Sequence, residues 1–326
     1  MRRPVTSVLL LLFLVATLYV ARPVRPPAAV PAVAPVQKVL AVPTVVVAAP
    51  RGTYLVGERQ AWRAGGAHGA DLTPTVLHWI DIPEPSGAGV WRLAELESGH
   101  TLFGLGGPVY PRPTQRETLL LDPGTRHLYE MAGAAAPPLA VAPEVQVSGV
   151  RWAASGQFAV LVGAGPDGVG LYRWSPGGGT TWLGAAPSVA KVAALADPVV
   201  VTPAGDIWWF GHGRYPLHLT RATVSARGTV LGFVGGHAVW WAAGHSADVK
   251  VPGLPSATPQ FARNGRAAAY VAQVGRTTEL IVVSARGVVA SRVLPRGHAL
   301  ATGWLGRRVA VAVLSGTDAG TYVVSP

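Results

Sequence analysis

The feature that most constrains the fold is a short pattern that recurs along the second half of the chain. An apolar residue stands four positions before a glycine, and an apolar, strand-like run follows the glycine directly. The full copies are RWAASGQFAVLV (151–162), TVSARGTVLGFV (223–234) and QFARNGRAAAYV (260–271), and GWLGRRVAVAVL (303–314) is a shortened version. Because a turn glycine between two apolar runs indicates paired strands, the pattern predicts repeated β-hairpins.

The spacing of the copies predicts the size of the repeating unit. Val224 and Phe261 are 37 residues apart, and Phe261 and Trp304 are 43 residues apart. A period near 40 residues is typical of a four-stranded β-propeller blade and argues against the competing two-sheet sandwich. In the clearest unit we expect four strands, at Thr258–Ala262, Arg266–Val271, Thr277–Ser284 and Val288–Leu294.

The last unit helps to predict how the ring closes. It offers only three strands and ends in GTYVVSP, so an N-terminal strand should supply the fourth, and Thr53–Trp62 is the candidate. Five units can be placed after Gly149, and Leu72–Glu144 would supply two more. We therefore expect an all-β propeller of about seven four-stranded blades, with six as the alternative.

Composition agrees with an all-β chain that has no cysteine chemistry. The 326 residues include 40 glycines and 29 prolines, both of which break helices, and no amphipathic helix is recognisable after Arg51. Cysteine is absent. This excludes disulfides, thiolate metal sites, a cysteine nucleophile and lipid attachment through an N-terminal cysteine.

The N-terminus carries a targeting signal. Arg2 and Arg3 precede an uncharged apolar run, so residues 1–21 are interpreted as a signal peptide or an uncleaved signal anchor helix. Residues 22–50 are rich in proline and alanine and are expected to be an extended linker, leaving residues 51–326 as the propeller. The predicted location is extracytoplasmic, either anchored to the membrane by the N-terminus or secreted after cleavage.

The net charge of +11 does not by itself predict nucleic-acid binding. Six basic residues precede the first acidic residue, Glu58, and the rest of the chain has 21 basic and 16 acidic residues. That remainder has no basic run interleaved with aromatic residues, which a surface that follows phosphates would need. We expect no nucleic-acid partner.

A glycine motif at Gly163, Gly165 and Gly168 has the spacing of a dinucleotide-binding loop. A true loop of that kind opens a helix, whereas here the strand-like run VGLYRW follows. The intervening Pro166 and Asp167 are typical of a tight turn. The motif therefore predicts a hairpin and no cofactor.

Two further segments carry a family resemblance. SPGGGTTW (175–182) resembles the Asp-box turn between the third and fourth strands of sialidase-like blades, with Gly177 in place of the aspartate. The repeats WAASGQFAV and FARNGRAAAY, and the Gly-His pairs at 99–100, 236–237 and 297–298, resemble WD40/TolB-like β-propellers, although no Trp-Asp dipeptide occurs. The resemblance covers about Gly149 to the end and implies a fold rather than an activity.

A search for catalytic chemistry assigns no catalytic, cofactor or metal residues. The string around Ser246 lacks the final glycine and the helix of a nucleophile elbow. Two histidine pairs, His212 with His218 and His237 with His245, lack the usual metal-ligand spacing. The carboxylate pairs Asp81 with Glu84 and Glu95 with Glu97 are interpreted as solvated residues at strand ends.

The pairs Trp208–Trp209 and Trp240–Trp241 require separate consideration. Consecutive strand residues face opposite sides of a sheet, so one member of each pair should pack between blades. The other member could bind a glycan or a protein, although packing of both between blades is the favoured interpretation.

Together these features predict a non-enzymatic, exported propeller that binds or scaffolds a partner at the bacterial cell envelope. The expected partner is an envelope protein, a peptide or a glycan, and the expected contact with the membrane is through the N-terminal helix. The alternative is a propeller-type hydrolase, either a sialidase-like glycan hydrolase or a metal-dependent lactonase. A cluster of carboxylates or histidines at one mouth of the channel would distinguish the two.

Overall fold

The computed structural model describes residues 35–65, 71–97, 101–105, 107–133, 136–186 and 188–326. They belong to one compact unit, Pro35–Pro326, built from strands and turns. The expected signal or anchor helix at residues 1–21 lies outside the described residues. Within the part of the chain that the structure describes, no helix has the length and apolar character needed to cross a membrane.

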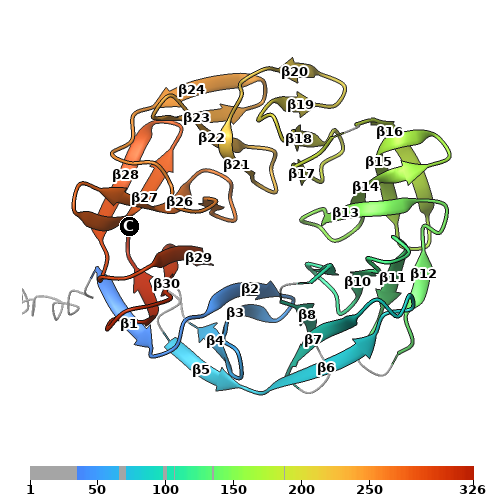
Figure 1. Ribbon diagram of the computed structural model, residues 1–326, viewed down its shortest axis with the longest axis horizontal. Helices are drawn as coiled ribbons and strands as arrows, with labels where there is room; N and C mark the ends of the chain where they lie inside the picture. The colour runs from blue at the N-terminus through green and yellow to red at the C-terminus, as the bar shows by residue number, and fades with distance from the viewer. Residues whose placement is uncertain (1–34, 66–70, 98–100, 106, 134–135, 187) are drawn as a thin grey trace, which may run out of the picture. The chain divides into compact units, whose positions relative to one another are not determined.

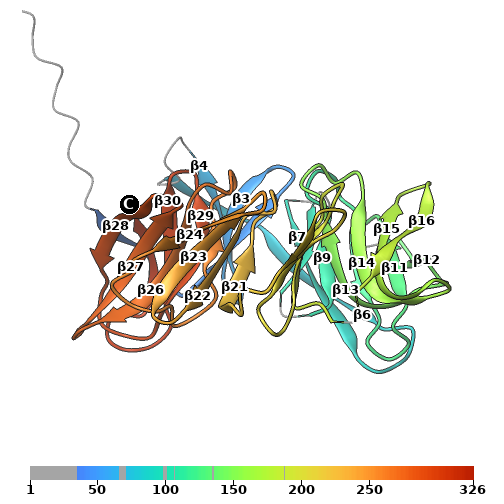
Figure 2. The same cartoon turned by 90° about the horizontal axis from the view of Figure 1, so that it is seen from above.

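The described strands pair into eight antiparallel sheets that are arranged in a ring, which confirms the β-propeller fold (Figure 1). Seven sheets have four strands and one has three. Figure 2 shows that the strands cross the thickness of the ring. The first three sheets in chain order consist of β2 Val45–Ala49, β3 Gly52–Val56, β4 Ala61–Gly65 and β5 Asp71–Thr75; of β6 Leu77–Pro83, β7 Val90–Leu96 and β8 Thr101–Gly104; and of β9 Val109–Pro111, β10 Thr118–Leu121, β11 Leu128–Met131 and β12 Leu139–Val141. The next three consist of β13 Gln146–Trp152, β14 Ala159–Gly165, β15 Gly168–Ser175 and β16 Gly179–Ala185; of β17 Lys191–Ala193, β18 Val199–Val201, β19 Ile207–Trp209 and β20 Gly213–Tyr215; and of β21 Thr220–Val224, β22 Val230–Val234, β23 His237–Ala242 and β24 His245–Val249. The last two consist of β25 Gln260–Phe261, β26 Ala268–Val274, β27 Thr277–Ser284 and β28 Gly287–Val293, and of β29 Ala299–Leu305, β30 Arg308–Val313 and β31 Gly320–Val324 together with β1 Val36–Leu40.

The middle strands of the sheets are apolar on both faces because each sheet packs between two neighbours. In β26, Ala269 and Val271 belong to the core shared with β29–β31, whereas Ala268 and Tyr270 belong to the core shared with β21–β24. Alternate side chains of a strand point to opposite faces, so one strand contributes to two cores. This explains why the strand runs read as continuously apolar rather than alternating.

The ring has eight blades, so the expected number of seven is wrong. The five units after Gly149 are confirmed, and the stretch Leu72–Glu144 supplies two sheets as expected. The additional sheet is β2–β5, which begins at Val45 within the range assigned to the linker.

Ring closure uses a different strand from the one expected. β1 pairs with β31, with Val36 opposite Val324, whereas Thr53–Trp62 lies in β3 and β4 of the next sheet. Residues 35–50 of the expected linker therefore belong to the propeller. Proline interrupts residues 22–35 every few positions, but β1 and β2 contain none, which leaves them free to form strands.

The three-stranded sheet runs in the opposite radial direction from the others. One residue, Val76, separates β5 at the outer edge of its sheet from β6. Crossing a four-stranded sheet from edge to edge would need about 14 Å, since strands lie about 4.8 Å apart. β6 is therefore an outer strand, and the sheet proceeds inward to β8, which contacts the innermost strand β9 (Figure 1). This reversal breaks the repeat pattern in the first half of the chain.

Candidate binding channel

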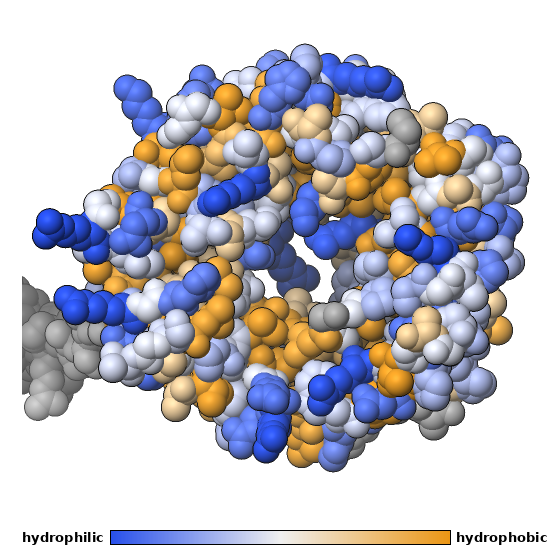
Figure 3. Space-filling view, viewed as in Figure 1, coloured by the Kyte–Doolittle hydropathy of each residue, from blue (hydrophilic) through white to orange (hydrophobic). Residues whose placement is uncertain are grey.

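A cavity with a volume of about 910 Å³ lies among the described residues at the centre of the ring. Its walls come from five neighbouring sheets, through their innermost strands β9, β13, β17, β21 and β25 and the turns that follow β13, β21 and β25. Figure 3 shows the hollow at the centre of the ring, with hydrophilic residues inside it. The cavity is therefore a feature of the ring as a whole and not of one blade.

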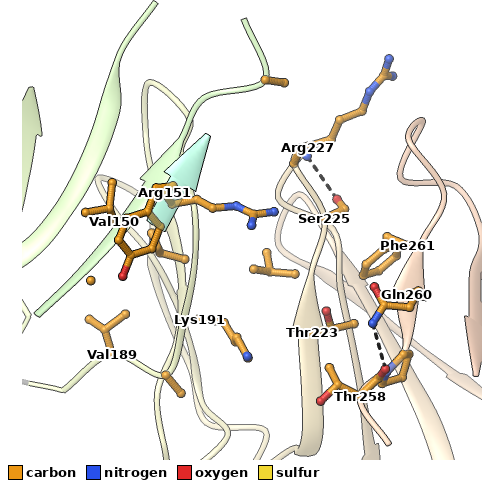
Figure 4. Close-up of a pocket in the computed structure, with 18 of the residues that line it drawn as sticks. Val150, Arg151, Val189, Lys191, Thr223, Ser225, Arg227, Thr258, Gln260 and Phe261 are labelled. Atoms are coloured by element: carbon orange, nitrogen blue, oxygen red, sulfur yellow. Dashed lines mark hydrogen bonds between the residues drawn. The ribbon is translucent and has the colours of Figure 1, made fainter. Parts of the chain in front are cut away.

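Four basic residues line this cavity, and its described lining contains no carboxylate. Figure 4 shows the side chains of Arg151 and Lys191 extending into the space, while Arg227 points away from them; Arg263 is the fourth. All four are exposed, and none forms an ion pair with a described carboxylate. We call these four residues the channel cations.

The recurring sequence pattern explains where the channel-facing turns lie. In each copy the glycine closes a β-turn between the first two strands of a blade, with the Gly228 amide donating to the Ser225 carbonyl at 3.0 Å and the Gly265 amide to the Ala262 carbonyl at 2.8 Å. Both glycines have positive φ, at 80° and 67°, which most residues adopt only with strain. The repeats thus place equivalent turns around the same channel.

The channel walls alter the ionisation of two lining residues. Arg151 is accessible to solvent through the channel, but the protein on either side limits its hydration and lowers its pKa below the usual value. An arginine still remains charged at neutral pH. Burial raises the pKa of the Tyr110 hydroxyl, so this group stays neutral and can donate a hydrogen bond.

Tryptophan side chains tie the innermost strands of neighbouring blades together. The Trp152 Nε1 group in β13 donates to the Tyr110 carbonyl in β9 at 2.9 Å, and the Trp304 Nε1 group in β29 donates to the Gln260 carbonyl in β25 at 2.8 Å. Because Tyr110 and Gln260 both line the cavity, these bonds fix the main chain of its wall. The binding surface is held in place by inter-blade contacts.

The two predicted turns occur where the sequence indicated. Gly165 pairs with Gly168 across a two-residue turn between β14 and β15, so the glycine motif is a hairpin, as expected. The Asp-box-like segment joins β15 and β16, the third and fourth strands of their blade, with the Gly178 amide donating to the Ser175 carbonyl at 2.9 Å.

Three of the histidines considered as metal ligands lie beside an aspartate. His212 lies 3.3 Å from Asp197, His218 lies 3.1 Å from Asp206, and His237 lies 3.7 Å from Asp248, as nitrogen–oxygen distances. Among the described residues no group of three or more histidine, aspartate or glutamate side chains is arranged to hold a metal ion. Ser246 lies in the outermost strand β24, away from the channel strands. His100 lies outside the described residues.

One of the two carboxylate pairs departs from the expected solvated environment. Glu97 lies between Arg51 and Arg63, at 3.8 and 3.9 Å, and accepts a hydrogen bond from the Tyr54 hydroxyl. Glu84, by contrast, is only 7% exposed, so its interpretation as a solvated residue is wrong. Glu84 begins the hairpin that joins β6 and β7, and the Ser86 amide of this hairpin donates to the Asp122 carboxylate after β10.

The tryptophan pairs pack between blades, the interpretation that the sequence favoured. Trp240 and Trp241 are buried in two different cores, on opposite faces of β23. Trp208 and Trp209 are half-buried, and they stack on Phe210 and His212 at ring-centroid distances of 4.5 and 3.7 Å. Sequence reasoning missed the channel cations, although Arg227 and Arg263 both fall within the turn of the recurring pattern.

Comparisons with known proteins find similar solved structures and no matching family or sequence. No protein-family model and no curated protein sequence matches the chain. Similar solved structures include TolB from Acinetobacter baumannii, at 14% identity over 80% of this chain with a TM-score of 0.37; the match covers 65% of the TolB chain, less than two thirds of it. They also include BamB from Moraxella catarrhalis, at 10% identity over 89% of this chain and 88% of that chain with a TM-score of 0.45. A streptogramin B lyase is similar at 11% identity, over 89% and 97% of the two chains, with a TM-score of 0.41. The β-propeller fold that the sequence resemblance implied is shown by the sheets of the structure itself.

Proposed function

We propose that this protein is a binding module that takes up its partner in the central channel. The observation that carries the proposal is the cavity of about 910 Å³, whose wall combines fixed main chain with basic and hydrogen-bonding side chains. This volume falls in the upper part of the range of about 300–1,000 Å³ that is typical of ligand pockets. The wall is held by inter-blade bonds, so binding would require little reorganisation.

The alternative, a hydrolase, finds less support in the channel. Glycoside hydrolysis uses two carboxyl groups that flank the scissile bond, and the described lining of the cavity provides none. The ionisable side chains that do line it are arginines, a lysine and a tyrosine, which bind and orient anions more readily than they exchange protons at neutral pH. The chemistry of the site therefore supports binding.

The proposed location is extracytoplasmic, with the propeller tethered or released at its N-terminus. The support for this comes from the sequence, in which two arginines precede an apolar run. A reporter enzyme active only after export, fused after Pro35, would test the location. A reporter that remains cytoplasmic would contradict it.

Site-specific photo-crosslinking in the native cell tests the function. A photoreactive residue replaces Thr223 in the cavity wall, and a matched variant carries it at Arg286, an exposed residue of the β27–β28 hairpin. We expect Thr223 to give a discrete crosslinked species that Arg286 does not give. Equal crosslinking from both positions, or none from Thr223, would contradict binding in the channel.

A further inference from the structure

Resting on the binding function proposed above, we infer that the ligand of the channel is an extended, acidic polypeptide segment. Its carboxylates would pair with Arg151 and Lys191, and its main chain would hydrogen-bond to the free edge of an innermost strand. The argument uses the charge of the channel, the edges of its strands and the nature of its apolar surface.

The charge of the channel calls for an anionic partner. Arg151 in β13 and Lys191 at the start of β17 come from neighbouring sheets, and both extend into the same space (Figure 4). Their charges lie in a walled cavity with no carboxylate among its described lining residues. Like charges that share a confined space repel one another, and an anion placed between them relieves that repulsion. Acidic side chains supply such an anion.

The edges of the strands favour a polypeptide over other anions. β13 pairs with β14 alone, and β21 pairs with β22 alone, so the channel-facing edge of each has no strand partner among the described residues. An exposed strand edge offers main-chain donors and acceptors at the repeat of an extended peptide. Nucleic acids and glycans lack the regular alternation of main-chain N–H and C=O groups that pairs with such an edge.

The apolar part of the wall agrees with a peptide. Val189, Val192 and Val224 line the cavity beside the basic residues, and short aliphatic surface suits alternate side chains of an extended segment. The aromatic residues of the lining, Tyr110 and Phe261, pack against the cores of their sheets. Tyr110 in β9 and Phe261 in β25 belong to sheets that three other sheets separate, so they do not form the succession of stacking side chains that a single-stranded nucleic acid requires.

A direct binding measurement with a defined probe tests the inference. A fluorescein-labelled peptide of four Val-Glu repeats is titrated with the full-length chain, and the matching Val-Gln peptide serves as the neutral probe. We expect the Val-Glu peptide to bind roughly tenfold or more tightly than the Val-Gln peptide, the size that a few charge-assisted hydrogen bonds provide. The binding should weaken as salt is raised, because salt screens exposed charges.

Matched variants assign the binding to the channel. The double variant Arg151→Gln/Lys191→Gln should lose about tenfold or more in affinity. The control Arg276→Gln/Arg286→Gln removes the same charge from exposed hairpins outside the cavity and should bind as the wild type does. Arg151→Lys keeps the positive charge and should stay within about threefold of the wild type, which would assign the effect at this position to charge. Equal losses in the channel and control variants would overturn the inference.

The remaining outcomes separate this inference from the channel function itself. Inorganic phosphate and an oligothymidylate of eight nucleotides are added as competitors. Displacement of the peptide by either one at a lower concentration than unlabelled Val-Glu peptide would overturn the peptide assignment. If Thr223 crosslinks its partner in cells but the Val-Glu peptide neither binds nor blocks that crosslink, the acidic peptide is wrong and the channel function stands. If Thr223 gives no specific crosslink, both proposals fail.

Discussion

Asp122 accepts a hydrogen bond from the main-chain amide of Ser86, at 2.8 Å, and so joins two neighbouring blades. Asp122 follows β10 and is fully buried, while Ser86 lies in the hairpin between β6 and β7. The same carboxylate accepts hydrogen bonds from the amides of Gly124 and Thr125, at 2.9 and 3.2 Å. The buried Asp122 side chain therefore stabilises its own turn and also binds the hairpin of the three-stranded sheet β6–β8 to the next blade.

Removal of the Asp122 carboxylate should destabilise the propeller substantially. Asp122→Ala leaves three main-chain amides without their acceptor, at a cost of about 1–3 kcal/mol for each group that stays buried and unpaired. We expect a loss of about 2–5 kcal/mol in the free energy of unfolding, measured by urea titration. Asp71→Asn, at an exposed position in β5, is the control and should leave the urea midpoint unchanged. An unchanged midpoint for Asp122→Ala would contradict the inter-blade role.

Glu84 lies close to Asp122 and should give the stability a particular dependence on pH. Burial raises the pKa of Glu84, and the charge of Asp122 raises it further. For Asp122, burial acts to raise the pKa, but the hydrogen bonds from Ser86, Thr125 and Gly124 together lower it below its usual value. A raised carboxyl pKa contributes stability while the group is protonated, and that contribution is lost as pH rises through the folded-state pKa. Asp122 acts in the opposite sense, since its contribution is lost as pH falls through its lowered pKa.

The variant Glu84→Gln separates these two effects. The substitution removes a buried charge that repels Asp122, so the variant should be more stable than the wild type at pH 7. This gain in stability should shrink as the pH falls toward 4, because Glu84 then becomes protonated in the wild type. Urea titrations at several pH values measure the difference. Glu95→Gln, in the adjacent strand β7, should show no comparable gain. A stability difference that grows on acidification would contradict the assignment to Glu84.

The bond from Trp152 to the Tyr110 carbonyl should be measurable by one conservative change. Trp152→Phe keeps an aromatic ring in the core but removes the Nε1 donor, leaving a half-buried carbonyl unpaired. We expect a loss of about 1–3 kcal/mol from the missing bond and the smaller ring. Trp208→Phe is a suitable comparison, since the described structure shows its ring stacked on Phe210 and in contact with Arg214. A smaller effect at Trp152 than at Trp208 would argue against the bond as a stabilising contact.

The parts of the fold that were predictable depend on local chemistry. Pro166 and Asp167 between two glycines specify a tight turn whatever surrounds them, and the hairpin is present. The strands near Thr277–Ser284 and Val288–Leu294 were predicted almost to the residue because glycine turns bound apolar runs. Turn residues and apolar runs that are close together in the sequence therefore predict the local structure correctly.

The parts that were missed depend on residues that meet only when the ring closes. Val36 and Val324 stand at opposite ends of the described chain, and no local signal indicates their pairing. Likewise, nothing near Arg151 in the sequence shows that Lys191 will extend into the same cavity. The eighth blade was not counted because its first strand, β2, begins at Val45, within the proline- and alanine-rich range that was assigned to the linker.

The closing strand provides a direct test of the ring, because it can be removed without touching any other blade. A chain lacking residues 1–34 retains β1, and a chain lacking residues 1–43 does not. Loss of β1 exposes the edge of β31, removes the half-buried Val36 and Leu40 from two cores, and breaks the hydrogen bond from the Thr321 hydroxyl to the Val42 carbonyl. We expect the longer truncation to lower the free energy of unfolding by about 2–5 kcal/mol and to increase protease sensitivity near β31, while the shorter one leaves both unchanged.

A synthetic peptide of residues 35–44 should restore part of the stability by pairing with the open edge. Equal stability of the two truncated chains would show that β1 does not close the ring.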